Sequence, residues 1–243
     1  MKRVDLQKLK KLLMCLIVKP WRNPLRYGVA AAIEHDFFFR RYSFDTIVDI
    51  GANKGQFSLV MKKNFPMANI LAFEPLHQPF LTYSKIFEDD RCVKIFNSAI
   101  APNEDVVEIN VSRSCDSSSL LEISDLQDEV FPGTSAIGSE SITTGPLDSF
   151  VSKEQIQGTS LLKLDVQGFE LEALRGCNTL LSLFDMVYCE CSFFELYTGQ
   201  ALAPEIIEFM TMKGFVLQGF NNVAYAKDGR TIQADFIFHK AKK

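Results

Sequence analysis

The sequence is poor in the side chains that most often build zinc sites and disulfide frameworks. It has three His and six Cys among 243 residues, and no two Cys are spaced as CxxC. No His lies near a Cys in a zinc-ligand pattern, so a structural zinc site is not expected. Cys92, Cys189 and Cys191 lie in apolar segments, where a free thiol acts as a small hydrophobic side chain. We therefore expect reduced structural thiols.

Long hydrophobic runs and a strong excess of one charge are also missing. The longest early apolar run, residues 12–18, has seven residues, whereas a membrane-spanning helix needs about 20. No small-residue cleavage site of a signal peptide follows it. The net charge of −4, from 26 basic and 30 acidic side chains, argues against a general nucleic-acid binder. We expect a cytoplasmic protein without a nucleic-acid partner.

Positive charge is concentrated at the start of the chain. Residues 1–27 contain eight Lys or Arg and one acid, for a net charge of +7, so the remainder carries −11. The leucines at positions 6, 9, 12, 13 and 16 fall on one face of a predicted helix, with lysines around them. Such a helix either lies on an anionic membrane, at its inner face, or packs as a cap on the body or on a second subunit. We favour the cap.

After residue 44, short β-branched runs alternate with amphipathic stretches of helix length. Strands are predicted at 46–50, 69–73, 92–96, 161–164 and 186–191, and helices at 56–64, 79–89, 170–181 and 204–213. Two more strands, at 214–220 and 234–239, flank the turn signals Asn221-Asn222 and Asp228-Gly229. The pattern is typical of an α/β protein with a doubly wound sheet. We expect a helical arm over residues 1–43 and one domain over 44–243.

The stretch after the third strand interrupts this alternation. Residues 106–112 predict an extended strand, whereas residues 125–144 are rich in Gly, Ser and Thr and have little periodicity. Such composition predicts a surface loop or lid. We expect this loop and the arm to select the substrate.

The turn after the first strand, which starts at Asp49 and runs through Gly51 to Gly55, points to a polar ligand. Glycines after a strand let the backbone approach a ligand, and the N-terminus of the next helix favours polar groups. The spacing is GxxxG rather than the GxGxxG of dinucleotide binders. Asp49 would repel a pyrophosphate but accept from an ammonium group, so S-adenosylmethionine fits better than NAD. A tight strand–helix turn without a ligand is the alternative.

Carboxylates end three of the predicted strands. Glu74 lies 23 residues beyond Gly51, where a carboxylate can hold both hydroxyls of a ribose. Asp165 ends a central strand and Glu190 ends its neighbour, so both would lie in one cleft, suited to general-base chemistry or to a hard cation. The alternative is that Glu74 is a surface residue and that Asp165 only caps the next helix.

Eight segments appear in a fixed order along the chain. They are VDIGANKGQFS (48–58), FEP (73–75), NSAIA (97–101), SSSLL (117–121), LDSFV (147–151), LKLDVQGFELEALRG (162–176), ECSFFELYTGQ (190–200) and QADFIF (233–238). Together they resemble the FkbM family of S-adenosylmethionine-dependent methyltransferases, over about residues 44–240. The resemblance implies a Rossmann-like class I methyltransferase fold, with seven strands of which the last is antiparallel.

The resemblance also implies roles for individual residues. Those at the methionine end of the cofactor would be Asp49, Gly51, Ala52, Asn53 and Gly55. The ribose would be held by Glu74, followed by Pro75, and the adenine would lie near Asn97, Ser98 and Ala99. Asp165 would face the sulfonium and the incoming hydroxyl. The family often has Glu where this chain has Gln167, which weakens any metal site, and none is predicted.

The predicted function is transfer of a methyl group from S-adenosylmethionine to a hydroxyl of a carbohydrate, glycolipid or similar acceptor. Asp165, with Glu190 beside it, would take the hydroxyl proton. A route in which these two carboxylates hold Mg²⁺ is the one that we favour less. The alternatives are an NAD- or nucleotide-sugar-binding Rossmann protein, which the missing GxGxxG disfavours, and a catalytically silent binding module, which the intact Asp49, Glu74 and Asp165 disfavour.

Overall fold

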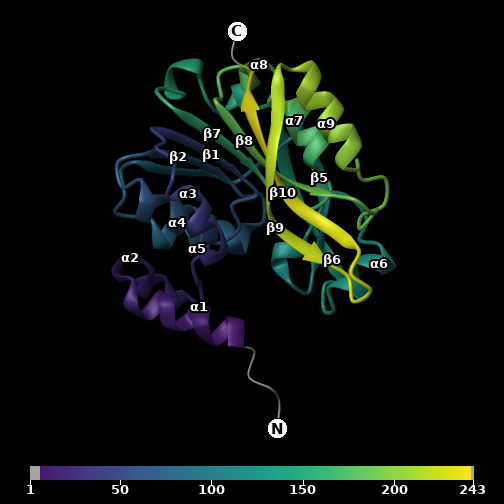
Figure 1. The fold of residues 1–243 in the computed structure, drawn as a ribbon, viewed down its shortest axis with the longest axis horizontal. Helices are drawn as coiled ribbons and strands as arrows, with labels where there is room; N and C mark the ends of the chain where they lie inside the picture. The colour runs from purple at the N-terminus through teal and green to yellow at the C-terminus, as the bar shows by residue number, and fades with distance from the viewer. Residues whose placement is uncertain (1–5, 242–243) are drawn as a thin grey trace.

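A computed structural model describes residues 6–241 of the chain (Figure 1). The charged residues Lys2, Arg3 and Asp5 of the arm lie outside this range, and the burial of the Leu6 and Lys8 side chains is not described either. Within the described range, no helix is both long and apolar enough to cross a membrane.

Nine α-helices and ten strands are found between residues 6 and 241. The helices are α1 (Leu6–Ile17), α2 (Lys19–Arg22), α3 (Asp36–Phe39), α4 (Gln56–Asn64), α5 (His77–Ile86), α6 (Asp125–Val130), α7 (Glu170–Gly176), α8 (Asn178–Leu181) and α9 (Ala203–Met212). The strands are β1 (Thr46–Ile50), β2 (Asn69–Phe73), β3 (Val93–Phe96), β4 (Ala99–Ile100), β5 (Asp105–Ser112), β6 (Ala136–Gly145), β7 (Ser160–Leu164), β8 (Met186–Ser192), β9 (Phe215–Tyr225) and β10 (Thr231–Lys240).

Seven strands form the main sheet, in the order β3-β2-β1-β7-β8-β10-β9. β1 pairs in parallel with β2 and β7, and β7 with β8, whereas β10 is antiparallel to both β8 and β9. The prediction of a doubly wound sheet with an antiparallel last strand is therefore confirmed. The strand order reverses between β1 and β7, and ligands of open α/β sheets bind at the carboxyl ends of strands at such a switch point.

Each face of the sheet is covered by its own hydrophobic core, because successive residues of a strand point to opposite faces. Val48, Leu162 and Val187 pack with α7, α8 and α9 on one face. Ile47 and Tyr188 belong to the core on the other face, which α4 and the arm cover. Figure 1 shows α7 and α9 on one side of the sheet, with α1 and α4 on the other.

The arm packs on the body, but not through the leucine stripe of α1. Cys15 and Trp21 are fully buried, and Trp21 Nε1 donates to the Leu59 carbonyl of α4 over 2.9 Å. The leucines at positions 9, 12, 13 and 16 are 46–56% exposed. The arm therefore contacts the body through other residues, and the apolar stripe that was expected to make the cap faces away from the core.

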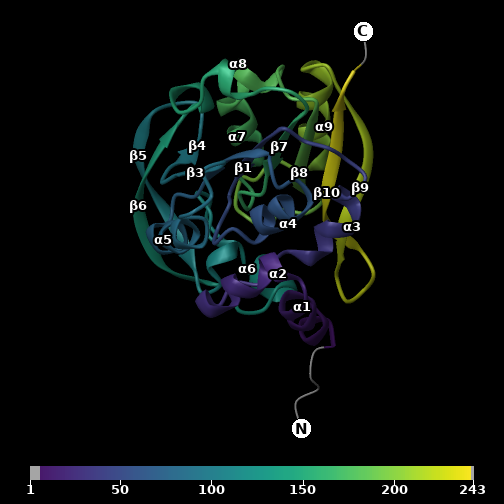
Figure 2. The same ribbon diagram turned by 90° about the vertical axis from the view of Figure 1, so that its left-hand side faces the viewer.

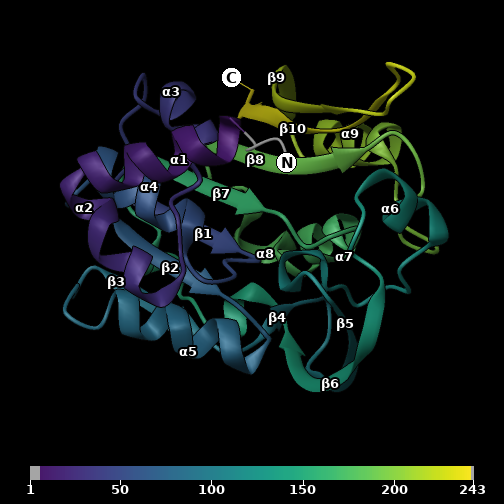
Figure 3. The same cartoon turned by 90° about the horizontal axis from the view of Figure 1, so that it is seen from below.

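The prediction of a loop or lid over residues 125–144 is wrong. The segment holds α6 and most of β6, which pairs with β5 and β4 in a second, three-stranded sheet. Figures 2 and 3 show β5 and β6 at the side of the molecule away from β9 and β10. Most of β6 is exposed, with Ile142 as its buried apolar residue, so no hydrophobic alternation revealed it.

Two boundaries near the end of the domain also differ from the prediction. β9 runs through Asn221-Asn222 without a turn, and Asn222 has a positive φ of 47° at an irregularity in the pairing with β10. The hairpin turn lies at Asp228-Gly229, as one of the two signals indicated. The helix predicted over 170–181 consists of α7 and α8, which are separated at Cys177.

Candidate active site

A cavity of about 240 Å³ lies at the carboxyl ends of β1, β2 and β7. Of the residues predicted from the sequence, it is lined by Gly51, Ala52, Asn53, Glu74, Pro75, Ser98, Ala99 and Asp165. Asp49, Gly55, Asn97 and Glu190 do not line it. The strand order therefore brings most of the predicted site together at the switch point of the sheet.

The two glycines of the β1–α4 turn are required by packing within the protein. Gly51 has a φ of +76°, and a Cβ there would lie 1.9 Å from the Asp165 carbonyl oxygen. Gly55 has a φ of +93°, and its Cβ would meet the Phe87 ring at 2.7 Å. The turn thus packs directly on the end of β7, next to the cavity. The expectation that these glycines let a ligand approach the backbone stays a prediction.

Glu74 is 5% exposed and lies at the end of β2. Its carboxylate accepts from the backbone N–H of Asn53 at 2.8 Å and of Leu76 at 2.9 Å. Burial raises the pKa of Glu74 to about 7, against the smaller opposing effect of these bonds. A carboxylate has about four acceptor positions, so this one can still accept from ligand hydroxyls. Asn97 donates to the Glu74 and Pro75 carbonyls and orders this turn.

Asp49 lies behind the cavity wall, fully buried. Its Oδ1 is 3.2 Å from Nζ of Lys163 on β7, and its Oδ2 accepts from the Ser58 hydroxyl at 2.8 Å. The ammonium group beside Asp49 is thus that of Lys163, which lines the cavity and donates to the Gly51 carbonyl at 3.0 Å. Burial alone would lower the pKa of Lys163, but Asp49 and Asp165 outweigh it and raise that pKa to about 12.

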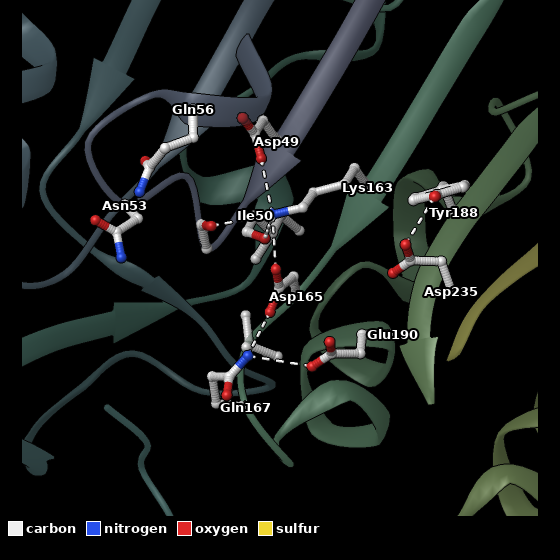
Figure 4. A network of polar contacts seen from close by, with 12 residues as sticks. Asp49, Ile50, Asn53, Gln56, Lys163, Asp165, Gln167, Tyr188, Glu190 and Asp235 are labelled. Carbon is white, nitrogen blue, oxygen red and sulfur yellow. Dashed lines mark hydrogen bonds and ion pairs between the residues drawn. The ribbon is translucent and has the colours of Figure 1, made fainter. Parts of the chain in front are cut away.

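Gln167 joins the two carboxylates predicted to be catalytic. Its Nε2 lies 2.6 Å from Asp165 Oδ1 and 3.1 Å from Glu190 Oε2 (Figure 4). Tyr197 donates to Gln167 Oε1 at 2.7 Å, which fixes the orientation of the amide. Burial, and then the charge of Asp165, raise the pKa of Glu190 well above its ordinary value. Asp165 faces the cavity, whereas Glu190 lies behind the amide.

This arrangement does not fit a magnesium site. Mg²⁺ needs oxygen ligands, but the Gln167 amide N–H groups lie between Asp165 and Glu190 and donate to both. Across residues 6–241, no three His, Cys, Asp or Glu side chains gather as metal ligands.

The arm brings a histidine to the cavity that no strand-end pattern predicted. His35 ends a 3₁₀ turn, Ile33–His35, and lines the cavity together with Glu34 and Lys11. Its Nδ1 lies 3.1 Å from the Tyr188 hydroxyl of β8. Tyr188 in turn donates to Asp235 of β10 at 2.7 Å (Figure 4). Burial raises the pKa of Asp235 to about 7.

Comparisons of the sequence with known proteins agree with the motifs. The sequence profile described as the methyltransferase FkbM domain matches residues 49–217. "Methyltransferase 1" of Beauveria bassiana is 27% identical over 144 residues, which make up 54% of this chain and 58% of that protein. The chain thus matches somewhat more than half the length of this relative.

Two solved structures are similar at low sequence identity. The precorrin-6y C5,15-methyltransferase of Geobacter metallireducens is 13% identical, with a TM-score of 0.45, over 85% of this chain and 86% of that one. The fibrillarin of Aeropyrum pernix with natively bound S-adenosyl-L-methionine is 11% identical, with a TM-score of 0.47, over 81% of this chain and 66% of that one.

Proposed function

The chain belongs to the FkbM methyltransferase family, and on that premise we propose that it transfers a methyl group from S-adenosylmethionine to a hydroxyl of a carbohydrate, glycolipid or similar acceptor. The observation that carries the proposal is the cavity at the switch point, with the buried Glu74 carboxylate and the Gly51 turn in its wall. S-adenosylmethionine supplies an electrophilic methyl group. The protein has to align an acceptor oxygen with it and remove a proton.

The cavity residues that suit successive parts of the cofactor follow one another in the order of the strands in the sheet. Ser98, after β3, and Glu74, at the end of β2, suit the adenine and ribose, and Asn53 after β1 suits the methionine end. Asp165, at the end of β7, is next in that order. Its side chain is 40% exposed, so an acceptor can reach it.

Asp165 is proposed to take the hydroxyl proton directly, without a metal. The Gln167 amide holds Oδ1, and Lys163 Nζ lies 3.8 Å from Oδ2. Glu190 acts through Gln167 and is proposed as a positioning residue.

We also propose that α1 contacts an anionic membrane, where a glycolipid acceptor would be found. Its exposed leucines, together with Ile17, which is 67% exposed, form an apolar face within a basic arm. Lys11 of the same helix lines the cavity, so an acceptor held in the membrane would lie near it. The intact protein should pellet with vesicles containing phosphatidylserine and be released by high salt. If the protein does not bind these vesicles and sediments as a dimer, the apolar face of α1 contacts a second copy of the chain instead.

Calorimetric titration followed by turnover tests the proposed activity. We expect binding of S-adenosylmethionine and no binding of NAD. We then expect release of S-adenosylhomocysteine with methyl hexopyranosides (glucose, galactose and mannose forms) as probes. Binding of NAD would select the dinucleotide alternative. Binding of S-adenosylmethionine without turnover on any acceptor, including extracted glycolipids, would select the silent binding module.

A further inference from the structure

The cavity has a wall that the sheet does not supply. Lys11, Glu34 and His35 of the arm line it together with the residues at the strand ends. His35 contacts Tyr188 of β8 and lies 3.8 Å from Asp235 of β10. The strand order therefore separates two ends of the cavity. Glu74, which follows β2, lies at one end, and His35, which contacts β8 and β10, lies at the other. If the cofactor lies as proposed, its methyl group points towards β7 and the acceptor has to enter from the side of His35.

Two side chains contact Nδ1 of His35, Asn222 and Tyr188. Nδ1 lies 3.0 Å from the side-chain amide nitrogen of Asn222, which can only donate. With Nδ1 as the acceptor of this bond, the proton of the neutral ring is on Nε2. Nδ1 also lies 3.1 Å from the Tyr188 oxygen, whose own proton goes to Asp235, so a ring protonated on Nδ1 would instead donate to Tyr188. The same amide donates to Asp235 at 2.8 Å, which fixes its orientation. Asn222 reaches this position because of its positive φ at the irregularity in β9.

The ring is also held in place and kept neutral. Phe57 packs edge-on against it, with ring centroids 5.3 Å apart. Burial, followed by the positive charges of Lys163 and Lys11, lowers the pKa of His35 to about 3. The other groups that face it are Glu34 on the arm, Tyr188 and Asp235. Above pH 5 the ring is therefore neutral, with one N–H donor and one acceptor nitrogen.

The rest of the arm wall has both donors and acceptors but no net charge. Lys11 Nζ lies 3.2 Å from Glu34 Oε2, so the ammonium and the carboxylate neutralise each other. A phosphate or a cation would gain little there, whereas the hydroxyls of a sugar can both donate and accept. The aromatic edge of the wall suits the apolar face of a sugar ring.

We propose that the arm supplies the acceptor subsite, in which Nε2–H of His35 donates to an oxygen of a neutral sugar and Glu34 and Lys11 bind its hydroxyls. This inference rests on the proposed function and adds the class of acceptor and the residues that bind it. His35 is a binding residue here, and Asn222 is a positioning residue that keeps the proton on Nε2.

Two variants of His35 separate the N–H donor from the shape of the ring. His35→Phe keeps a flat ring without a donor, whereas His35→Gln places an amide N–H near the position of Nε2. For the methyl hexopyranoside that is turned over best, we expect KM to rise at least about fivefold in His35→Phe, with a smaller change in kcat, and to recover in His35→Gln. His77→Phe, whose histidine does not line the cavity, is the matched control.

Titration with S-adenosylmethionine distinguishes a failure of the proposed function from a failure of the acceptor subsite. Affinity for S-adenosylmethionine should be the same in all three variants and in the wild type. A wild-type protein that binds no S-adenosylmethionine would refute the proposed function. If the wild type methylates a probe and His35→Phe shows the same KM, the function stands and the acceptor subsite is wrong.

Nitrogen NMR gives a readout that does not need turnover. The chain has three histidines, so His35 is assigned by the signals that vanish in His35→Phe. We expect the pattern of a neutral ring protonated on Nε2 between pH 5 and 8, and a shift of these signals when S-adenosylhomocysteine and a methyl hexopyranoside are added together. An Nδ1-protonated or charged ring, or no response to any of the three sugars at tens of millimolar, overturns the proposal.

Discussion

Lys163 of β7 and Asp49 of β1 are neighbours in register, and Nζ of the lysine lies 3.2 Å from Oδ1 of the aspartate. Both side chains are almost completely buried, at 6% and 0% exposure. A charge left alone in such a place is costly, whereas removing both charges together is often neutral. The pair links the two central strands at the cavity, with Lys163 in its wall and Asp49 behind it.

We expect Lys163→Met to lower the free energy of unfolding by about 3–5 kcal/mol, because Asp49 loses its buried partner. The double variant Asp49→Asn/Lys163→Met should recover much of that loss. Urea unfolding followed by circular dichroism measures both. Equal stability of the single variant and the wild type would contradict a stabilising ion pair between Asp49 and Lys163.

The buried carboxylate of Glu74 should make cofactor binding depend on pH. Glu74→Ala removes charge-assisted hydrogen bonds worth about 1.5–3 kcal/mol each, so affinity for S-adenosylmethionine should fall at least about tenfold. Because the pKa of Glu74 is raised to about 7, wild-type affinity should increase between pH 6 and 8 as the carboxylate ionises. Calorimetry at three pH values checks this. Glu74→Gln should bind weakly and without that dependence, and unchanged affinity in either variant would remove Glu74 from the site.

Local patterns predicted the sheet because its strands carry their own hydrophobic runs and its motifs lie at strand ends. They did not predict the pairing of Asp49 with Lys163, which depends on the register of β1 and β7. An isolated lysine in the apolar segment 160–164, next to a strand containing one aspartate, was the available signal.

No comparable sequence signal indicated the contact between His35 and Asn222. They are 187 positions apart in the chain, and their contact depends on the docking of the arm and on an irregularity in β9. β6 was missed for a different reason, since a strand that is mostly exposed and rich in Ser and Thr has the composition of a loop. Sequence patterns therefore did not predict the side of the cavity at which the acceptor is proposed to bind.

Glu170 provides a test of stability against pH. The carboxylate is buried and accepts from the backbone N–H of Val166 and Gly168, and burial raises its pKa to about 7. A carboxyl with a raised pKa adds stability below its unfolded pKa of about 4.3, and that stability is lost as pH rises through the folded value. The melting temperature of Glu170→Gln should therefore fall less than that of the wild type between pH 5 and 7.5. Parallel curves for the two proteins would contradict the burial of a titrating Glu170.

Truncations test the boundary between arm and domain. Deleting residues 1–19 removes the buried Cys15 but leaves Trp21, which is fully buried and bonded to α4. We expect this protein to fold, with a reduced melting temperature. Deleting residues 1–43 also removes Trp21 and Phe39 from the core, and each large buried aromatic side chain contributes about 3–5 kcal/mol. We expect that shorter protein to be unfolded or aggregated. Circular dichroism and gel filtration distinguish the outcomes.

Asp165→Asn tests the chemistry most directly. An asparagine keeps the shape of the side chain, and its carbonyl oxygen can still accept from Gln167, but it cannot take a proton. Turnover on a confirmed acceptor should therefore fall by about 10²–10⁴, while affinity for S-adenosylmethionine changes little. Turnover should fall less in Glu190→Gln, because Glu190 contacts the site only through Gln167.

Wild-type activity should survive EDTA, because an amide donor lies between the two carboxylates. Loss in EDTA that Mg²⁺ restores would instead show that Gln167 turns away to admit a metal, and full turnover in Asp165→Asn would leave alignment of the two substrates as the source of catalysis.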